Sequence, residues 1–253
     1  MKAICQTSIP FDVWTPRPLP GIQPTTLSDV LIRDDAFDGQ LAERDRLLRT
    51  QRDSVLQMQP SALPAARELL DLVLGLAYPA QVGAKEVERP DGVVVPLDRE
   101  DPLGTLGRLV QEDFCILQKQ ADEHVLTGAV LCFPASWMLA EKFGRPLMAI
   151  HVPVDSYDDN VGRRVQRLFD GVKPDRPLWR FNALPYNDPT LHQPRSQHAR
   201  REDRNDARAQ FLRSERQVIL RLPETGAVVF AIHTFLLPWD VAEAARLRVE
   251  TMS

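Results

Sequence analysis

The chain has 253 residues, of which 43% are hydrophobic and 26% are charged, as in an ordinary globular protein of one large domain. Its net charge of −4 gives no long-range attraction to nucleic acid, and no apolar run approaches the roughly 20 residues of a membrane-spanning helix. The N-terminal sequence MKAICQTSIPFDVW lacks the apolar segment of a secretory signal. We therefore expect a cytoplasmic protein that binds neither nucleic acid nor membranes.

The first part of the chain is predicted to be an extended arm followed by a helical region. Residues 1–26 contain five prolines and few periodic apolar positions, which favours an extended arm. Residues 27–80 are expected to form a helical region packed on the core. Within it, apolar residues between 38 and 58 recur at helical spacing. A second helix is predicted to begin after Ser61, as its N-cap, and to end at Tyr78.

The remainder, residues 81–253, is predicted to mix short strands with short helices. Apolar and β-branched runs predict strands at 92–97, 114–118, 125–133, 146–154 and 179–184. Helices are predicted after the N-cap Asp101, between Ser136 and Gly144, over 158–170 and over 241–249. The polar stretch 187–210 has no apolar period and is predicted to be a long loop.

The strongest local pattern is a β-hairpin near the end of the chain. Two apolar, β-branched runs, 218–222 and 227–236, flank the turn sequence Pro-Glu-Thr-Gly. Strands joined by so short a turn pair in the antiparallel sense. Together the predicted elements indicate the α+β class with a largely antiparallel sheet.

The cysteines form no recognisable metal or disulfide motif. There are three, Cys5, Cys115 and Cys132, and no two are spaced as C-x-x-C. An odd number without that spacing argues against a disulfide framework and against a structural zinc site. Because Cys115 and Cys132 lie in apolar runs, we expect both to be buried thiols of the core.

Common catalytic and cofactor motifs are absent as well. The chain has no G-x-G-x-x-G after a strand, no G-x-x-x-x-G-K-[ST], no H-E-x-x-H and no G-x-S-x-G. Two histidines lie in apolar runs. His151 follows LMAI and precedes VPV, so it is predicted to be at least partly buried, either as a core histidine or as a ligand. His233 lies within FAIHTF, where strand alternation could place it on either face.

Several segments together resemble a known family. They are DGQLAERDRLLRTQRDSVLQMQPSALPAARELLDLVLGLAYP, EDFCIL, VLCFPASWMLAEKFGRPLMAIHVPVDSY, LWRFN and SERQVILRLPETGAVVFAIHTFLLP. Their order and spacing, roughly from Pro18 to Pro238, resemble the haem-binding subunit of the haem-dependent oxidative N-demethylase family. The chain departs from the family pattern at His233, where the family often has Arg, and at Phe235, which stands in the place of a Tyr.

The resemblance implies a PAS-like core, in which an antiparallel sheet with short helices forms a pocket for haem b. It implies the oxygen-dependent removal of a methyl group from a small amine. In the family, electrons reach the haem protein from NADPH through partner subunits that carry flavin and iron–sulfur centres. This chain has no motif for those groups, which implies a hetero-oligomer with a reductase. It also lacks C-x-x-C-H, so the haem would be held non-covalently.

His151 is the candidate iron ligand, because it lies in the family-like segment IHVPV and one neutral imidazole can hold haem iron on one face. His233 and His192 are the alternatives. Oxygen chemistry on the open face needs a proton donor, and the candidates are Asp155, Tyr157 and Asp158. The haem propionates need cationic partners, and the candidates are Arg180, Arg216 and Arg221, for which structural ion pairing is the alternative role.

Two other functions fit the same sequence. One is a haem-binding sensor, because a PAS-like pocket serves signalling as well as catalysis. The other is an assembly subunit that has lost its haem. An absorbance spectrum excludes the last if a Soret band is present, and NADPH-driven turnover with a reductase separates the enzyme from the sensor.

Overall fold

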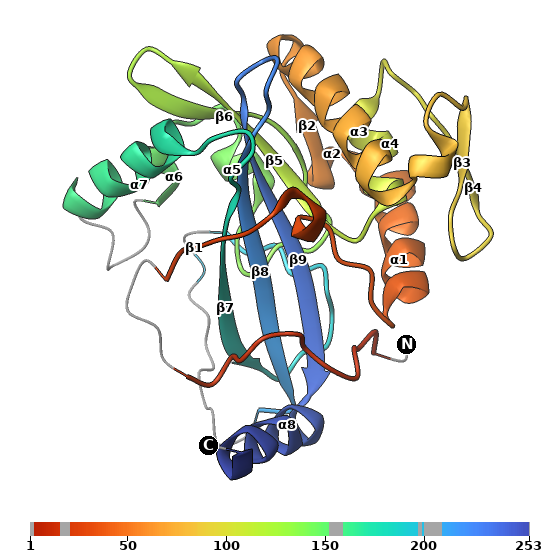
Figure 1. Cartoon of the computed structure of the whole chain (residues 1–253), viewed down its shortest axis with the longest axis vertical. Helices are drawn as coiled ribbons and strands as arrows, with labels where there is room; N and C mark the ends of the chain where they lie inside the picture. Colours follow the sequence, from red (N-terminus) through yellow and green to blue (C-terminus); the bar gives the residue numbers. More distant parts are fainter. Residues whose placement is uncertain (1–2, 16–20, 152–158, 197–198, 200–208, 253) are drawn as a thin grey trace.

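The structure is a computed structural model that describes residues 3–15, 21–151, 159–196, 199 and 209–252, with the backbone alone at 151, 159–163 and 247–252. Its centre is a seven-stranded antiparallel sheet of order β1-β7-β8-β9-β5-β6-β2 (Figure 1). The strands are β1 (Gln23–Pro24), β2 (Leu56–Met58), β5 (Asp113–Gln120), β6 (Glu123–Val130), β7 (Leu178–Tyr186), β8 (Phe211–Arg221) and β9 (Val228–Pro238). Strands β3 (Glu86–Glu88) and β4 (Val94–Pro96) form a separate pair. The predicted α+β class with an antiparallel sheet is confirmed.

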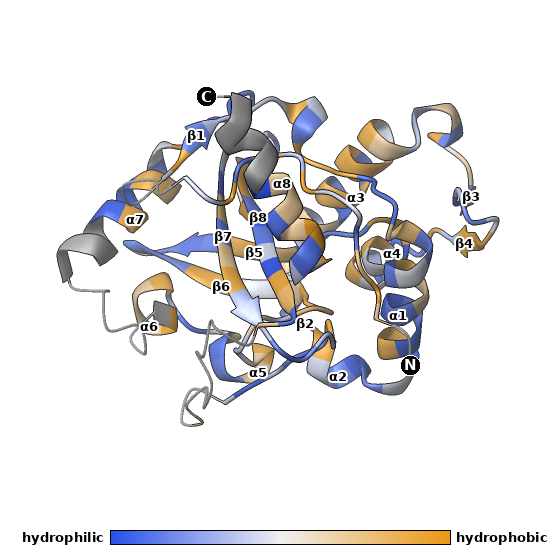
Figure 2. Cartoon of the chain, turned by 90° about the horizontal axis from the view of Figure 1, so that it is seen from below, coloured by the Kyte–Doolittle hydropathy of each residue, from blue (hydrophilic) through white to orange (hydrophobic). Residues whose placement is uncertain are grey.

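Helices cover both faces of the sheet (Figure 2). One face packs against α1 (Phe37–Thr50), α3 (Leu63–Ala77) and α4 (Pro102–Leu109), and we call it the α3 face. The other packs against α5 (Leu139–Lys142), α6 (Leu147–His151) and α7 (Asp159–Gly171), and we call it the α7 face. The short α2 (Arg52–Val55) leads into β2, and α8 (Trp239–Met252) follows β9.

Strand alternation divides the core between these faces. Val218 and Val229 lie in the cluster of the α3 face, whereas their neighbours Ile219 and Val228 lie in that of the α7 face. Successive side chains of a strand point to opposite faces, and directly paired residues share a face. The register of the sheet therefore assigns a face to every polar side chain on β7, β8 and β9.

The predicted hairpin is confirmed and is longer than the sequence pattern indicated. Strands β8 and β9 pair without interruption from Phe211 opposite Pro238 to Arg221 opposite Val228. At the turn, the Gly226 N–H donates to the Leu222 carbonyl at 3.1 Å, and Gly226 has a φ of +69°, which an L side chain rarely adopts. The turn residues therefore set the register of both long strands.

The structure confirms several predicted helices and helix ends. Asp101 accepts a hydrogen bond from the Gly104 N–H at 3.2 Å, so it caps α4 as expected. Helix α3 ends at Tyr78, also as expected. Helix α7 and helix α8 occupy the segments predicted near 158–170 and 241–249.

Three secondary-structure predictions are wrong. The helix expected to reach residue 58 ends at Thr50, and β2 pairs with β6 beyond it. Ser61 lies in a short 3-10 turn, and Ala62 takes the N-cap position of α3. The strand expected at 146–154 is the helix α6 over 147–151; residues 152–154 lie outside the described part.

The physical reason for α6 can be read from its first turn. Pro146 supplies a carbonyl that accepts the Ile150 N–H at 3.1 Å, and proline is well suited to the start of a helix because it has no N–H to satisfy. Leu147 and Ile150, one turn apart, both pack on the α7-face core. The apolar run that begins at Leu147 therefore fits the spacing of a helix as well as that of a strand.

The arm and the cysteines complete the fold. Phe11, from the arm, packs on Trp179, Phe181 and Phe235, with ring centroids 5.5, 4.9 and 5.6 Å away. All three cysteines are free, and Cys115 and Cys132 are buried as predicted. Burial raises the pKa of each of these two thiols to about 12, so both stay protonated and unreactive at neutral pH. Among the helices in the described residues, none is both long and apolar enough to cross a bilayer.

Candidate functional site

The predicted iron ligand and proton donors lie at the edge of what the structure describes. His151 is the last residue of α6, and only its backbone is described. Asp155, Tyr157 and Asp158 lie outside the described residues. Their roles therefore stay predictions.

The three candidate arginines are described, and they do not form one cluster. Arg180 pairs with Gln217, and Phe181 pairs with Arg216, so Arg180 and Arg216 point to opposite faces of the sheet. Arg216 stacks over Trp179, with its guanidinium carbon 5.2 Å from the ring centroid. Arg221 donates to the carbonyls of Val172, Gly226 and Phe169 at 2.6–2.9 Å, where it closes the C-terminal end of α7. A single haem cannot contact all three.

Arg180 belongs to a group of polar side chains on the α7 face. Asn182, Glu215 and Thr234 stand opposite one another across β7, β8 and β9, and Arg180 and Gln217 form the next cross-strand pair. We call Arg180, Asn182, Glu215, Gln217 and Thr234 the polar cluster. Ile232, two residues before Thr234 on β9, packs in the core beneath α5, α6 and α7, which fixes the face. The cluster therefore lies on the same side of the sheet as the helix that ends at His151.

Glu215 organises the polar cluster. Its Oε2 accepts the Asn182 Nδ2–H at 2.9 Å and the Gln217 Nε2–H at 3.0 Å, and its backbone N–H donates to Asn182 Oδ1 at 3.1 Å. Its other oxygen, Oε1, is buried without a partner among the described residues. The same holds for Arg180 Nε and Thr234 Oγ1. Native proteins rarely leave buried polar atoms unpaired unless a ligand, ion or water completes them.

Two cations flank Glu215. Burial lowers the pKa of Arg180 and of Lys142, and in both cases the charge of Glu215 opposes that effect. Lys142, at the end of α5, has its Nζ 4.7 Å from the Trp137 ring centroid. These two side chains bring positive charge to the α7 face, which suits a ligand that carries carboxylates.

His192 has the hydrogen bonding of a metal-ligating histidine. Its Nδ1 lies 2.8 Å from the Cys132 carbonyl, to which it can only donate. The neutral ring then carries its proton on Nδ1 and leaves Nε2 as a lone-pair donor. No other hydrogen bond of the His192 ring is found within the described part of the chain. Of the alternatives to His151 named from the sequence, this one keeps a free nitrogen.

A buried ion pair holds the carbonyl that orients His192. The Asp113 carboxylate accepts the Cys132 N–H at 2.7 Å and the Phe133 N–H at 2.8 Å. Arg44 Nη1 donates to the same carboxylate at 2.7 Å, and both side chains are buried. The position of Cys132, and with it that of His192, is therefore fixed by a paired charge in the core.

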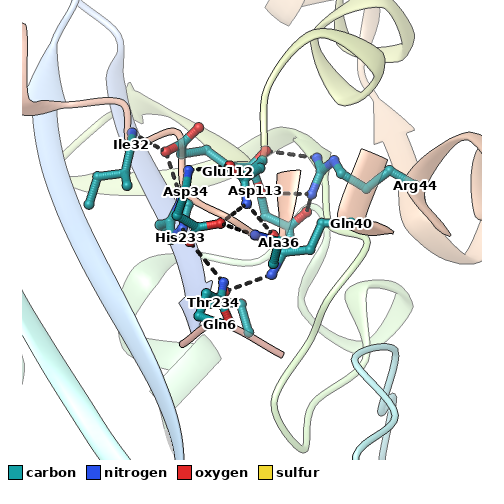
Figure 3. Close-up of polar contacts among 11 residues, drawn as sticks. Gln6, Ile32, Asp34, Ala36, Gln40, Arg44, Glu112, Asp113, His233 and Thr234 are labelled. Carbon is teal, nitrogen blue, oxygen red and sulfur yellow. Dashed lines mark hydrogen bonds and ion pairs between the residues drawn. The ribbon is translucent and has the colours of Figure 1, made fainter. Parts of the chain in front are cut away.

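His233 is not available as a ligand, because both of its ring nitrogens face carboxylates (Figure 3). Nδ1 lies 3.0 Å from Glu112 Oε1, and Nε2 lies 2.9 Å from Asp34 Oδ2. Burial alone would lower the pKa of His233, but the hydrogen bonds and charges of the two carboxylates outweigh it and raise the pKa to about 9. The ring is thus a buried imidazolium at neutral pH, and it tethers the segment around Asp34 to the sheet.

Sequence reasoning missed most residues of the polar cluster and the carboxylates that contact His233. Arg213, Glu215 and Gln217 are polar residues at alternate positions of a strand that ends in the apolar run 218–220, which is a signal that one face of that strand meets something polar. Lys142 and Thr234 carry no comparable signal. Asp34 lies 199 residues from His233, and nothing local connects the two.

Comparison with known families gives one match. A family model described as "Haem-dependent oxidative N-demethylase, alpha subunit-like" matches residues 21–250. The match spans all the elements from β1 to β9 that build the sheet and both of its helical layers.

Proposed function

The chain belongs to the family of haem-dependent oxidative N-demethylase alpha subunit-like proteins, and we propose that it binds haem b non-covalently and uses O₂ to demethylate a small amine. The match over residues 21–250 is the observation that carries this proposal, because it covers both the polar cluster and the candidate histidines. The haem, when bound, supplies the iron at which O₂ is activated.

The order of the strands supports a PAS-like core. The hairpin β5–β6 is followed by α5, α6 and α7 and then by β7, β8 and β9, and the last strand returns to pair with the first. Within these five strands the order is 2-1-5-4-3, with the helices inserted after the second strand. We assign residues 81–253 to this haem-binding domain, with 27–80 packed on it and 1–26 as an arm.

Several described side chains suit a haem. Arg180 and Lys142 are half-buried cations beside the α7 face, and we assign them to the two propionates. His192 offers a free Nε2 with its Nδ1 held by the Cys132 carbonyl. His151 ends α6 on the same side of the sheet. We therefore propose that one of these two histidines is the iron ligand, with His151 as the choice from the sequence and His192 as the choice from hydrogen bonding.

The remaining parts of the proposal concern protons, electrons and partners. We propose that Tyr157, Asp155 or Asp158, just after α6, delivers protons to the reacting oxygen. Electrons come from a separate reductase that carries flavin and iron–sulfur centres and oxidises NADPH, so the working enzyme is a hetero-oligomer. The description "alpha subunit-like" supports an assembly of several subunits.

The test begins with the absorbance spectrum of the purified chain. We expect a Soret band and a haem content near one per chain; a chain that takes up no haem, even when haem is added, would contradict the proposal. With a reductase and NADPH, amine-dependent formaldehyde release is expected. A haem protein that never turns over would instead point to a sensor.

The ligand is tested by His192→Ala and His151→Ala, with His124→Gln as the matched control. His124 lies on β6, and its Nδ1 is already engaged by Gln166 Nε2 at 2.8 Å. The ligand variant should lose most of its haem, whereas the other two should keep it. If all three variants kept haem and an unchanged spectrum, neither histidine would be the ligand.

A further inference from the structure

Three buried polar atoms without a partner in the described part of the chain gather on one patch of the α7 face. They are Arg180 Nε, Glu215 Oε1 and Thr234 Oγ1, all in the polar cluster. Glu215 is 5% exposed and Thr234 is 1% exposed, so bulk water does not satisfy either atom. Such a concentration of unpaired atoms marks the place where a ligand completes the structure.

The charge of Glu215 is handled differently from that of other buried carboxylates in this chain. Asp113 bonds directly to Arg44, and Glu112 bonds directly to His233. The direct partners of Glu215 are two neutral amides, and both bond to Oε2. A buried carboxylate is costly unless a cation is hydrogen-bonded to it, so Oε1 is arranged to receive a positively charged donor.

The nearby cations do not fill this role. Arg180 and Lys142 are close enough for their charges to act on Glu215, but Oε1 has no hydrogen bond from either. These two half-buried positive charges suit the two propionates of haem. With both cations paired to propionates, the negative charge of Glu215 calls for one positive charge from outside the chain.

We propose that Glu215 Oε1 and Thr234 Oγ1 form an ammonium-binding subsite, which holds the protonated nitrogen of a small secondary amine. Glu215 and Thr234 are directly opposite on adjacent strands, so their Cβ atoms are about 4.5–5.5 Å apart. A dialkylammonium ion has two N–H donors, one for the carboxylate oxygen and one for the hydroxyl oxygen. The identification of the amine as the substrate and the pairing of Arg180 and Lys142 with propionates rest on the proposed function, whereas the position of the subsite rests on the unpaired Glu215 Oε1 and Thr234 Oγ1 atoms.

The test is calorimetric titration of the purified chain, with its haem content recorded, using dimethylammonium chloride as the probe. Glu215→Gln keeps the shape and removes the charge, so the affinity for dimethylammonium should fall by about 10–100-fold with haem content unchanged. Thr234→Val should weaken binding by a smaller factor. Tetramethylammonium, which has the charge but no N–H, should bind the wild-type chain more weakly than dimethylammonium. Glu86→Gln, at an exposed position of β3, is the matched control and should bind as the wild type does.

The outcomes separate the subsite from the proposed function. Equal affinity of wild type and Glu215→Gln, or no binding of dimethylammonium by the wild type, overturns the subsite even if the protein holds haem and turns over. A chain that takes up no haem overturns the proposed function, and the same titrations still decide whether the cation site exists. If Glu215→Gln does not fold, Thr234→Val and the comparison of the two cations give the answer.

Discussion

Raising the pH should destabilise the protein through a single buried histidine. The pKa of His233 is raised from an ordinary value of 6.5 to about 9 by Asp34 and Glu112. A folded-state pKa above the unfolded one means that the folded chain holds a proton that the unfolded chain has released. The stabilisation is therefore complete below about pH 6.5 and is lost as the pH rises through 9.

The size of the effect follows from the two pKa values. At about 1.4 kcal/mol for each pH unit between 6.5 and about 9, the loss is about 3 kcal/mol in the free energy of unfolding. His233 is 1% exposed, so solvent screening does not reduce this figure greatly. Asp34 makes the stability of the protein depend on pH on the acid side as well. Burial alone would raise the pKa of Asp34, but hydrogen bonds and the charge of His233 outweigh that effect and lower it. Its stabilisation is lost as the pH falls below its ordinary value of 3.8.

Urea unfolding of wild type and His233→Gln, measured every half pH unit from 6 to 10, would test this reasoning. The wild type should lose about 3 kcal/mol more than the variant across that range. The buried thiols titrate in the same range in the unfolded chain, but they do so in both proteins and cancel in the difference. His124→Gln is the control, because burial lowers the pKa of His124 and places its titration below pH 6.5. Parallel curves for wild type and His233→Gln would refute the assignment.

If His233→Gln does not fold, NMR titration of the wild-type imidazoles replaces the variant. A His233 ring that titrates near pH 6.5 would then refute the assignment.

Three further variants, one of them with a matched control variant, test the core, the end of α7 and the proposed chemistry. Asp113→Asn should cost about 3–5 kcal/mol in urea unfolding, because it leaves the buried Arg44 without its carboxylate. Asp71→Asn, which breaks a half-exposed pair, should cost no more than about 1 kcal/mol, and equal losses would contradict the importance of burial. Arg221→Met should lower stability by about 1–3 kcal/mol and leave haem content unchanged, because its donors are engaged by carbonyls; loss of haem without loss of stability would restore it as a propionate partner. Tyr157→Phe should keep haem but reduce amine-dependent oxygen consumption by about 10²–10⁴-fold, and normal turnover would leave Asp155 or Asp158 as the proton donor.

The sequence predicts this fold where the signal is local and misses it where two periods compete. The hairpin of β8 and β9 is predictable because its turn ends in a glycine and both flanking runs are apolar. The stretch after Pro146 was predicted as a strand from its apolar composition, yet Leu147 and Ile150 also satisfy a helical period, and the core beneath α6 selects the helix. The segment 56–58 is a strand only because β6 offers it an edge, which no local pattern reveals.

The candidate site is harder to predict, because it depends on register. Arg180 and Arg216 look equivalent in the sequence, one as a basic residue of the predicted strand 179–184 and the other as a basic residue just before the predicted strand 218–222. Because Arg180 pairs with Gln217, the side chains of Arg180 and Arg216 lie on opposite faces of the sheet. A register shift of one residue would change which residues share a face. Only the family resemblance, and no local motif, directed attention to haem. The apolar surroundings and family-like segment that favour His151 say nothing about which ring nitrogen of a histidine is free.

The two faces of the sheet differ in how their buried charges are paired. On the α3 face, His233 lies between two carboxylates, and even Arg216, with one unpaired N–H, has the charges of Glu112 and Asp29 close by. On the α7 face, Glu215 has only neutral direct partners. A buried carboxylate without a hydrogen-bonded cation lowers stability, unless a ligand brings such a cation or other interactions offset the loss. The ion pairs of His233 supply such stability on the opposite face, so a ligand bound on the α7 face, as we propose, would leave them undisturbed.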